Sequence, residues 1–451
     1  MRHLLTDTNF RRLFTGRLVT NAGDSLYYVA AMWLVWELTH DPFYSGVAGF
    51  LTMGPSALQF LFGPLVDRWP LRRVLIGTQA FQAVLVLAIP LAAYTGHLSV
   101  WVVLAVMPLL ALANQLVYPA QSAALPRIVD QADLVDANSA FSLAYQGVDL
   151  VFNAAAGAVV ALAGAVALYA VDSLTFVAAA LLFAGVHIPV AADEQPTAGT
   201  DGAGDPPADV AATDGGESSA DDDAATGTVD DATTGTAPDG YLADLRAGLT
   251  VLRGSFLVLV LAGAAVVNFA SGATMASLPA FADTVGGAGA YGTLMAGFAA
   301  GNLGGALVAS RLDHLPFGKL NVAVFAVNGT LVAAAAVAAT AGAPLLVVVA
   351  LFALAFIPVG VGNVLLSSVV QAAVPESKLG RVSSLVGSAS QFAIPFGTLA
   401  GGAVAGAFGP VAAIYVLAGA ALLLAAYWLA VPALRTLPPV GDIDTLDQAQ
   451  A

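Results

Sequence analysis

The stretch LVDANSAFSLAYQGVDLVFNAAAGAVVALAG, residues 134–164, recurs in altered form as LGRVSSLVGSASQFAIPFGTLAGGAVAGAFG, residues 379–409. The two stretches align without a gap at an offset of 245, and the matched positions include Ser139 with Ser384, Gln146 with Gln391, Gly157 with Gly402 and Gly164 with Gly409. Loop residues upstream recur at an offset of 246, with Asp67, Pro70 and Arg73 opposite Asp313, Pro316 and Lys319. Because chance rarely repeats loop residues at a constant distance, the pattern predicts a duplicated unit with the same orientation in both halves.

The composition places this unit in a membrane. Of 451 residues, 58% are hydrophobic and 10% are charged, whereas soluble domains average about 25% charged residues. The apolar residues form long runs such as 74–91, 154–186 and 345–357, and a helix of ~20 apolar residues crosses a bilayer core. Because the runs are continuous rather than alternating, they favour helices over barrel strands. We therefore expect an all-α membrane protein.

Twelve transmembrane helices fit the runs, six on each side of a polar segment. Their approximate bounds are 15–38, 43–66, 72–94, 98–122, 138–161, 165–188, 255–281, 288–310, 318–340, 343–370, 382–406 and 410–432. The predicted organisation is two pseudo-symmetric six-helix bundles, 1–189 and 241–436, joined by an acidic disordered linker, 190–240, and followed by a tail, 437–451.

The formal charge of −15 comes mostly from the linker, where residues 193–239 include no lysine or arginine. An acidic chain without a basic stripe argues against nucleic-acid binding. Lysine occurs only at Lys319 and Lys378, and this preference for arginine and aspartate indicates a halophilic host. The absence of cysteine excludes disulfides and thiolate metal sites, and we expect no cofactor.

The basic residues orient the chain in the bilayer. None of the 15 lysines and arginines falls in a predicted outer loop when the N-terminus is cytoplasmic. Since positive residues are retained in the cytoplasm, both termini are predicted to be cytoplasmic in a multi-pass protein of the plasma membrane. The N-terminus shows no removable signal peptide, so the first span is expected to be retained.

The loop after the second span reads GPLVDRWPLRR, residues 63–73. It resembles the cytoplasmic signature of the major facilitator superfamily, Gly-x-x-x-Asp-Arg-x-Gly followed by two basic residues. Residues 311–319 are similar to a degenerate second copy. Pro70 stands where the family has a turn glycine, and Leu71 where it has a basic residue. The resemblance covers essentially the whole chain and implies the major facilitator fold.

In that family the loop belongs to a cytoplasmic gate. A carboxylate at the end of the second span sits against the positive N-terminal end of span eleven, which begins near Arg381. We expect Asp67, with Arg127 as its partner, to close the cytoplasmic side in the outward-facing state. The basic residues would hold the loop at the lipid head groups. The expected gate residues are Gly63, Asp67, Arg68, Arg72, Arg73 and Arg127. The alternative is that these charges only fix the topology.

Three further stretches, 9–24, 138–139 and 171–176, resemble the macrolide-efflux and enterobactin-exporter-like branch of the superfamily. This resemblance implies export of small amphipathic molecules or drugs. The Gly-rich signature of some drug–proton antiporters in span five is not intact, because 147–153 reads GVDLVFN.

Two carboxylates fall near the middle of predicted spans, Asp24 in span one and Asp149 in span five. A charge within the bilayer is costly and usually functional, and a buried carboxylate suits a proton-coupling site. The alternative is a structural hydrogen bond. For Asp172, in span six, the sequence favours neither of these two roles. Polar residues expected to line a central cavity are Asn21, Gln146, Asn153, Asn268 and Gln391, although helix–helix hydrogen bonds explain each of them equally well.

The sequence therefore predicts a secondary transporter of small molecules, working by alternating access as a monomer, with protons as the coupling ion. Enzymatic function is not expected, since the five histidines are scattered and no Gly-rich phosphate loop ends in Lys-Ser/Thr. Two alternatives stay open: a proton- or sodium-coupled nutrient importer, and a non-transporting membrane sensor or scaffold whose linker binds a partner.

Overall fold

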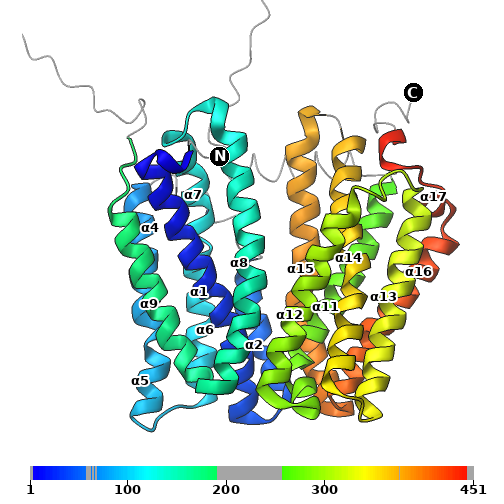
Figure 1. Ribbon diagram of the computed structural model, residues 1–451, viewed down its shortest axis with the longest axis horizontal. Helices are drawn as coiled ribbons and strands as arrows, with labels where there is room; N and C mark the ends of the chain where they lie inside the picture. Colours follow the sequence, from blue (N-terminus) through cyan, green and yellow to red (C-terminus); the bar gives the residue numbers. More distant parts are fainter. Residues whose placement is uncertain are drawn as a thin grey trace, which may run out of the picture.

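The computed structural model describes residues 4–56, 62, 66, 69–189, 256–374 and 376–443, and it contains helices but no strands over these residues. Two bundles of helices stand side by side, one from each half of the chain (Figure 1). The start of α1 and the last helix, α17, lie at the same end of the molecule, called here the terminal end. The opposite end is called the distal end.

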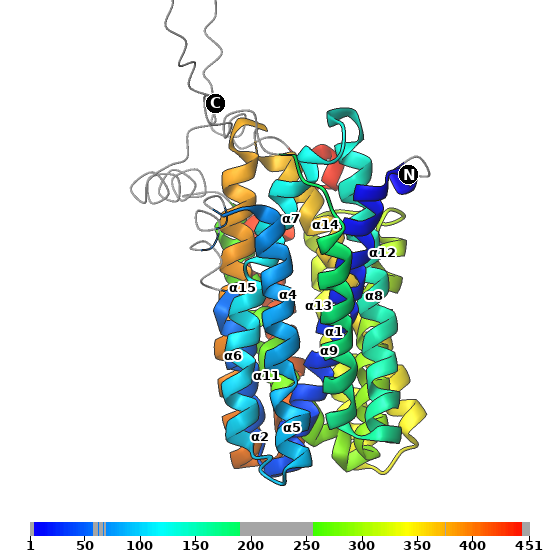
Figure 2. The same ribbon diagram turned by 90° about the vertical axis from the view of Figure 1, so that its left-hand side faces the viewer.

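The described part of the N-terminal half consists of long helices and of shorter helices that follow one another closely. Its helices are α1 (Thr8–Thr39), α2 (Pro42–Met53), α4 (Leu71–Val86), α5 (Ala88–Tyr94), α6 (Val100–Asn114), α7 (Val117–Ala124), α8 (Leu134–Ala163) and α9 (Ala165–Ala184). The pair α4–α5 forms one segment of 24 residues, Leu71–Tyr94, and the pair α6–α7 together with the short helix Leu125–Arg127 forms one segment of 28 residues, Val100–Arg127. Figure 2 looks onto this half, with α4 and α6 in front.

The C-terminal half has six long helices followed by a short one. They are α11 (Phe256–Val285), α12 (Gly287–Ala309), α13 (Phe317–Thr340), α14 (Leu345–Ala373), α15 (Glu376–Phe408), α16 (Pro410–Ala430) and α17 (Pro432–Arg435). Among the described residues of both halves, eight segments are long and apolar enough to cross a membrane, and α1, α2, α8 and α15 occupy the other four predicted spans. The all-α membrane fold is therefore confirmed. The linker lies outside the described residues, so its disorder stays a prediction.

The first helix begins earlier than the hydrophobic pattern predicted. It starts at Thr8 rather than near residue 15, because the Asp7 side chain caps it by accepting a hydrogen bond from the Phe10 N–H at 2.7 Å. Arg17, the third residue of the predicted span 15–38, lies inside the bundle and is 6% exposed. Hydropathy alone missed residues 8–14 because four of these seven residues are polar or charged.

The two halves repeat the same backbone turns. Gly164 and Gly409, which the sequence alignment matched, have φ values of 79° and 88° and each ends a long helix. Gly96 and Gly342 likewise have φ values of 73° and 71° at an offset of 246. Positive φ strains any residue with a side chain, so glycine is required at the same point of each half. These turns support the predicted duplication.

The halves touch through glycines at the distal end. Gly157 on α8 packs backbone to backbone on Gly292 of α12, and Gly46 on α2 does the same with Gly402 of α15. Gly46 and Gly292 are separated by 246 residues and Gly157 and Gly402 by 245, so the two contacts are symmetry equivalents. A methyl group at any of these positions would overlap the facing backbone.

Among the described residues, the hydrophobic core is shared by the halves toward the distal end. One cluster of buried residues draws on both halves, and within it the rings of Trp33 and Tyr291 stack with centroids 5.9 Å apart. Toward the terminal end the buried residues separate into a cluster around Phe10 and Phe183 in the N-terminal half and clusters around Phe317 and Leu257 in the C-terminal half. The described core thus joins the halves at one end and not at the other.

Replacing Gly157 by alanine should separate the halves at the distal end, because the added methyl group overlaps the Gly292 backbone. The chain contains no cysteine, so a cysteine placed at Ala290, which is fully buried in the shared core, reports on this separation. We expect Gly157→Ala to raise the labelling rate of this cysteine by a membrane-impermeant maleimide at least tenfold. Gly147→Ala, on the same helix with open space around it, is the matched control. Equal rates in the two variants would contradict the contact.

Candidate functional site

Asp24 of α1 lines a small polar cavity inside the N-terminal half. The cavity measures about 140 Å³, and its walls carry Asp24, Tyr27, Tyr28, Thr52, Gln82, Leu110, Ala111, Asn114, Gln115 and Phe176. The Asn114 amide donates a hydrogen bond to Asp24 Oδ2 at 3.2 Å. The carboxylate predicted from the first span therefore opens on a space that polar side chains from three other helices surround.

Asp172 of α9 lies directly behind α1 and has no exposed surface. Its Oδ1 and the hydroxyl of Thr175 lie against the backbone of Gly23, where a side chain would overlap both oxygens. Thr175 Oγ1 is 2.7 Å from the Asp172 carbonyl oxygen and 3.3 Å from Oδ1. Asp172 also interacts electrostatically with Asp24. The structure thus packs Asp172 against Gly23, the residue that precedes Asp24, although the two aspartates lie 148 positions apart in the sequence.

Two tyrosine hydroxyls share this buried region. Tyr27 and Tyr169 are 7% and 0% exposed, their rings meet edge to face at 6.0 Å, and both interact electrostatically with Asp172. Within the described part of the chain, the Tyr169 hydroxyl and Asp172 Oδ2 have no hydrogen-bond partner, whereas the Tyr27 hydroxyl faces the Thr52 side chain. Because buried polar atoms are normally paired, this concentration of open donors and acceptors marks a site rather than a packed core.

Arg17 forms a second polar cluster, nearer the terminal end. Its Nε donates to Gln121 Oε1 at 2.5 Å and lies 3.2 Å from the Tyr145 hydroxyl, which itself donates to Gln121 at 2.5 Å. The guanidinium also lies 5.6 Å from the Tyr145 ring centroid, a cation–π distance. The cluster joins α1, α7 and α8, and sequence reasoning missed it because Arg17 lies close to the start of the predicted span 15–38.

The other predicted coupling and cavity residues are less well defined. Asp149, Gln146, Asn153 and Gln391 lie on α8 and α15, but their side chains fall outside the described residues, so their roles stay predictions. The Asn21 amide donates to the Tyr145 carbonyl oxygen at 3.4 Å, a contact between α1 and α8. Asn268 is partly exposed on α11.

The predicted gate is described only in part. Gly63, Asp67 and Arg68 lie outside the described residues, so the gate itself stays a prediction. The Arg72 guanidinium donates to the Ala184 carbonyl oxygen at the end of α9. This places a cation at the negative end of a helix. Arg127 ends the short helix Leu125–Arg127 that follows α7.

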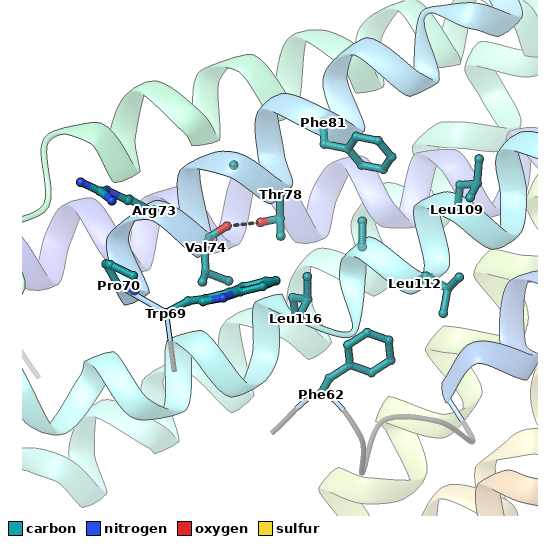
Figure 3. Close-up of a pocket in the computed structure, with 12 residues that line it drawn as sticks. Phe62, Trp69, Pro70, Arg73, Val74, Thr78, Phe81, Leu109, Leu112 and Leu116 are labelled. Atoms are coloured by element: carbon teal, nitrogen blue, oxygen red, sulfur yellow. Dashed lines mark hydrogen bonds between the residues drawn. The ribbon is translucent and has the colours of Figure 1, made fainter. Parts of the chain in front are cut away.

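Arg73 and Trp69 stand at one end of an apolar groove between α4 and α6 (Figure 3). The groove measures about 600 Å³, and its other walls are Phe62, Pro70, Val74, Gly77, Thr78, Phe81, Leu109, Leu112, Ala113 and Leu116. The Thr78 hydroxyl donates to the Val74 carbonyl oxygen at 2.8 Å and is therefore satisfied within its own helix. The groove thus offers a largely apolar surface with the Arg73 guanidinium at one end.

The sequence profile of the Major Facilitator Superfamily matches residues 13–397 and, separately, residues 260–444. The chain belongs to the major facilitator superfamily. The second match starts in the C-terminal half, in agreement with the internal repeat. Members of the superfamily are transporters, so the resemblance of the 63–73 loop pointed to the right family. A search of curated protein sequences finds no significant match.

Solved transporter structures share this fold at low identity. The nucleoside transporter NupG (D323A mutant) aligns with a TM-score of 0.67, 11% identity and coverage of 94% of this chain and 99% of that one. A bacterial homologue of the iron transporter ferroportin, in an inward-facing state, aligns with a TM-score of 0.63 and 15% identity. The alignment covers 93% of this chain and 97% of that one. A bacterial homologue of the human lysosomal transporter Spinster, in an inward-facing and unoccupied conformation, aligns with a TM-score of 0.60 and 14% identity. The alignment covers 97% of this chain and 96% of that one. At these identities the likeness shows the fold alone.

Removing the acceptor of Arg17 should destabilise the N-terminal half. Gln121→Ala leaves a buried guanidinium N–H and the Tyr145 hydroxyl without their shared acceptor, which costs about 1–3 kcal/mol. Thermal unfolding of the purified protein in detergent, followed by circular dichroism, should show a lower midpoint. Gln115→Ala, which removes only a bond from the side chain to its own helix, is the control. Equal midpoints for the two variants would show that the cluster is not structural.

Proposed function

We propose that this superfamily member is a secondary active exporter of small amphipathic molecules that works by alternating access. The observation that carries the proposal is the split core, continuous between the halves at the distal end and divided at the terminal end. With the termini in the cytoplasm, as the basic residues predict, this arrangement is the inward-facing state. An exporter takes its cargo in that state.

The character of the described surfaces supports an amphipathic cargo. Among the described residues, the one buried cation of the N-terminal half, Arg17, is engaged by Gln121 and Tyr145, and no cluster of three or more His, Cys, Asp or Glu side chains stands ready for a metal. The resemblance of residues 9–24 and 171–176 to exporters of the macrolide and enterobactin type supports the direction. The structural neighbours are named for cargo as different as nucleosides and iron, so the fold does not choose the cargo.

Fixing the distal end closed should stop export. Trp33→Cys with Tyr291→Cys places thiols where two rings now stack across the halves, and a short bifunctional thiol reagent joins them. We expect cross-linking to reduce ethidium efflux from energised cells at least tenfold, and reduction of the cross-link to restore it. The two single-cysteine variants, treated with the same reagent, control for modification alone.

The scaffold alternative is tested separately by deleting residues 195–235 from the linker. A transporter keeps its flux without them, whereas a scaffold that acts through the linker loses its function. Ethidium movement into cells rather than out of them, in the parent protein, would favour the importer alternative.

Neutralising the gate carboxylate should trap the inward-facing state. Asp67→Asn removes the charge proposed to seal the cytoplasmic side, so we expect efflux to fall roughly tenfold while a cysteine at Ala290 stays protected from labelling. Asp313→Asn changes the equivalent residue of the second copy, which is exposed, and is the matched control. Unchanged efflux in Asp67→Asn would leave topology as the loop's role.

A further inference from the structure

The apolar groove between α4 and α6 lies apart from the polar sites of the N-terminal half (Figure 3). Figure 2 views this half from the side turned away from the C-terminal half, and both helices lie in front. Three large side chains of the groove, Trp69, Phe81 and Leu109, are 48%, 50% and 45% exposed. Because apolar surface left open on the outer face of a membrane-spanning bundle meets lipid, the groove is reached from the bilayer.

Gly77 leaves the middle of the groove open. It lies inside α4, and a methyl group built on it would meet no atom of the described chain within 4 Å. Neither a turn nor a close helix contact therefore requires glycine here, although glycine is a poor helix former. The missing side chain instead leaves space in the groove, and this space suits a molecule that is not part of the chain.

The dimensions of the groove fit one acyl chain. It measures about 600 Å³, and Arg73 and Phe81 are eight positions apart on α4, about 12 Å at ~1.5 Å per residue. One leaflet contributes about half of the ~30 Å hydrocarbon core, so an acyl chain entering at Arg73 can follow the groove for most of its length. The hydroxyl of Thr78, halfway along, donates within its own helix and requires no polar group from the occupant.

The end of the groove where α4 begins is polar. Arg73 is exposed there, and its side chain has no partner among the described residues, whereas the neighbouring Arg72 donates to the Ala184 carbonyl oxygen. Trp69 stands at the same end, and tryptophan is enriched at the level of the lipid head groups. A basic residue at the mouth of an apolar space between membrane helices matches an anionic head group.

We propose that this groove binds one anionic phospholipid of the leaflet at the terminal end, which the basic residues predict to be the cytoplasmic leaflet. An acyl chain lies between α4 and α6, along the space left by Gly77, and the phosphate group contacts the Arg73 guanidinium. The head-group charge distinguishes this site from the ordinary lipid contacts of an apolar helix face. The site is independent of the direction of transport and of the cargo.

Trp69 reports on the occupant of the groove. It is one of five tryptophans, and the difference in fluorescence between the parent protein and Trp69→Phe isolates its signal. Phosphatidylglycerol and phosphatidylcholine with brominated acyl chains, which quench tryptophan on contact, are titrated into the full chain in detergent micelles. We expect phosphatidylglycerol to half-quench Trp69 at a concentration at least fivefold below that of phosphatidylcholine. Equal concentrations would show ordinary lipid contact and overturn the proposal.

The part played by the head group is tested with Arg73→Gln, measured with and without Trp69→Phe. Without the guanidinium we expect the two lipids to quench Trp69 at equal concentrations. Lys319→Gln is the matched control, because Lys319 is exposed, corresponds to Arg73 in the internal repeat and does not line the groove. It should keep the fivefold preference. A preference for phosphatidylglycerol that survives Arg73→Gln would overturn the proposal.

The part played by the acyl chain is tested with Gly77→Phe, which fills the groove with a ring. The half-quenching concentration of phosphatidylglycerol should rise at least fivefold. Gly419→Phe on α16, where a methyl group also meets no atom within 4 Å, is the matched control and should leave it unchanged. Unchanged quenching in Gly77→Phe would overturn the proposal. Where Gly77→Phe does not fold, Arg73→Gln decides, because it changes an exposed side chain.

Discussion

The contact between glycines at the distal end is the constraint on which the rest of the structure depends. Two helices can cross with their backbones touching only where neither has a side chain, and this occurs at Gly157 with Gly292 and at Gly46 with Gly402. The two crossings are related by the internal repeat, so they form a symmetric pair of helix contacts. Around them the halves share one described core, and away from them the described buried residues of each half form clusters of their own. At this end the halves are joined both by backbone contacts between glycines and by the stacked rings of Trp33 and Tyr291.

Glycine serves a different purpose within the N-terminal half. At Gly23 the missing side chain lets oxygens of Asp172 and Thr175 reach the backbone of α1, one residue before Asp24. A larger residue would separate α9 from α1 and take the two carboxylates apart. One small residue thus decides how closely Asp172 approaches α1, while its neighbour Asp24 lines the cavity.

The sequence predicted the fold well because its signals are collective. Twelve apolar runs, one-sided basic residues and a repeat of constant offset each draw on many positions, so single errors do not matter. The polar sites depend instead on which faces of particular helices meet. Asp24 was found because a charge in a span is conspicuous, but Asp172 could be paired with it only once α1 and α9 were placed together. Arg17 was misjudged because the polar first turns of α1, begun by the Asp7 cap, do not look like a span. The sequence did contain one signal for the packing of α9 on α1. It is the dipeptide Gly23-Asp24 in one span together with the motif Asp172-x-x-Thr175 in another.

The repeat also shows that the acidic site belongs to one half. At the offsets of 246 and 245, Asp24 corresponds to Ala270 and Asp172 to Leu417, and both of these are buried in the shared apolar core. The C-terminal half is therefore a packing partner without the same chemistry. Because α1 and α9 lie in the same bundle, the arrangement of Asp24 and Asp172 depends on how these two helices pack and not on the contact between the halves. The cavity beside Asp24 is likewise built from helices of the N-terminal half alone, so its shape is decided within that half.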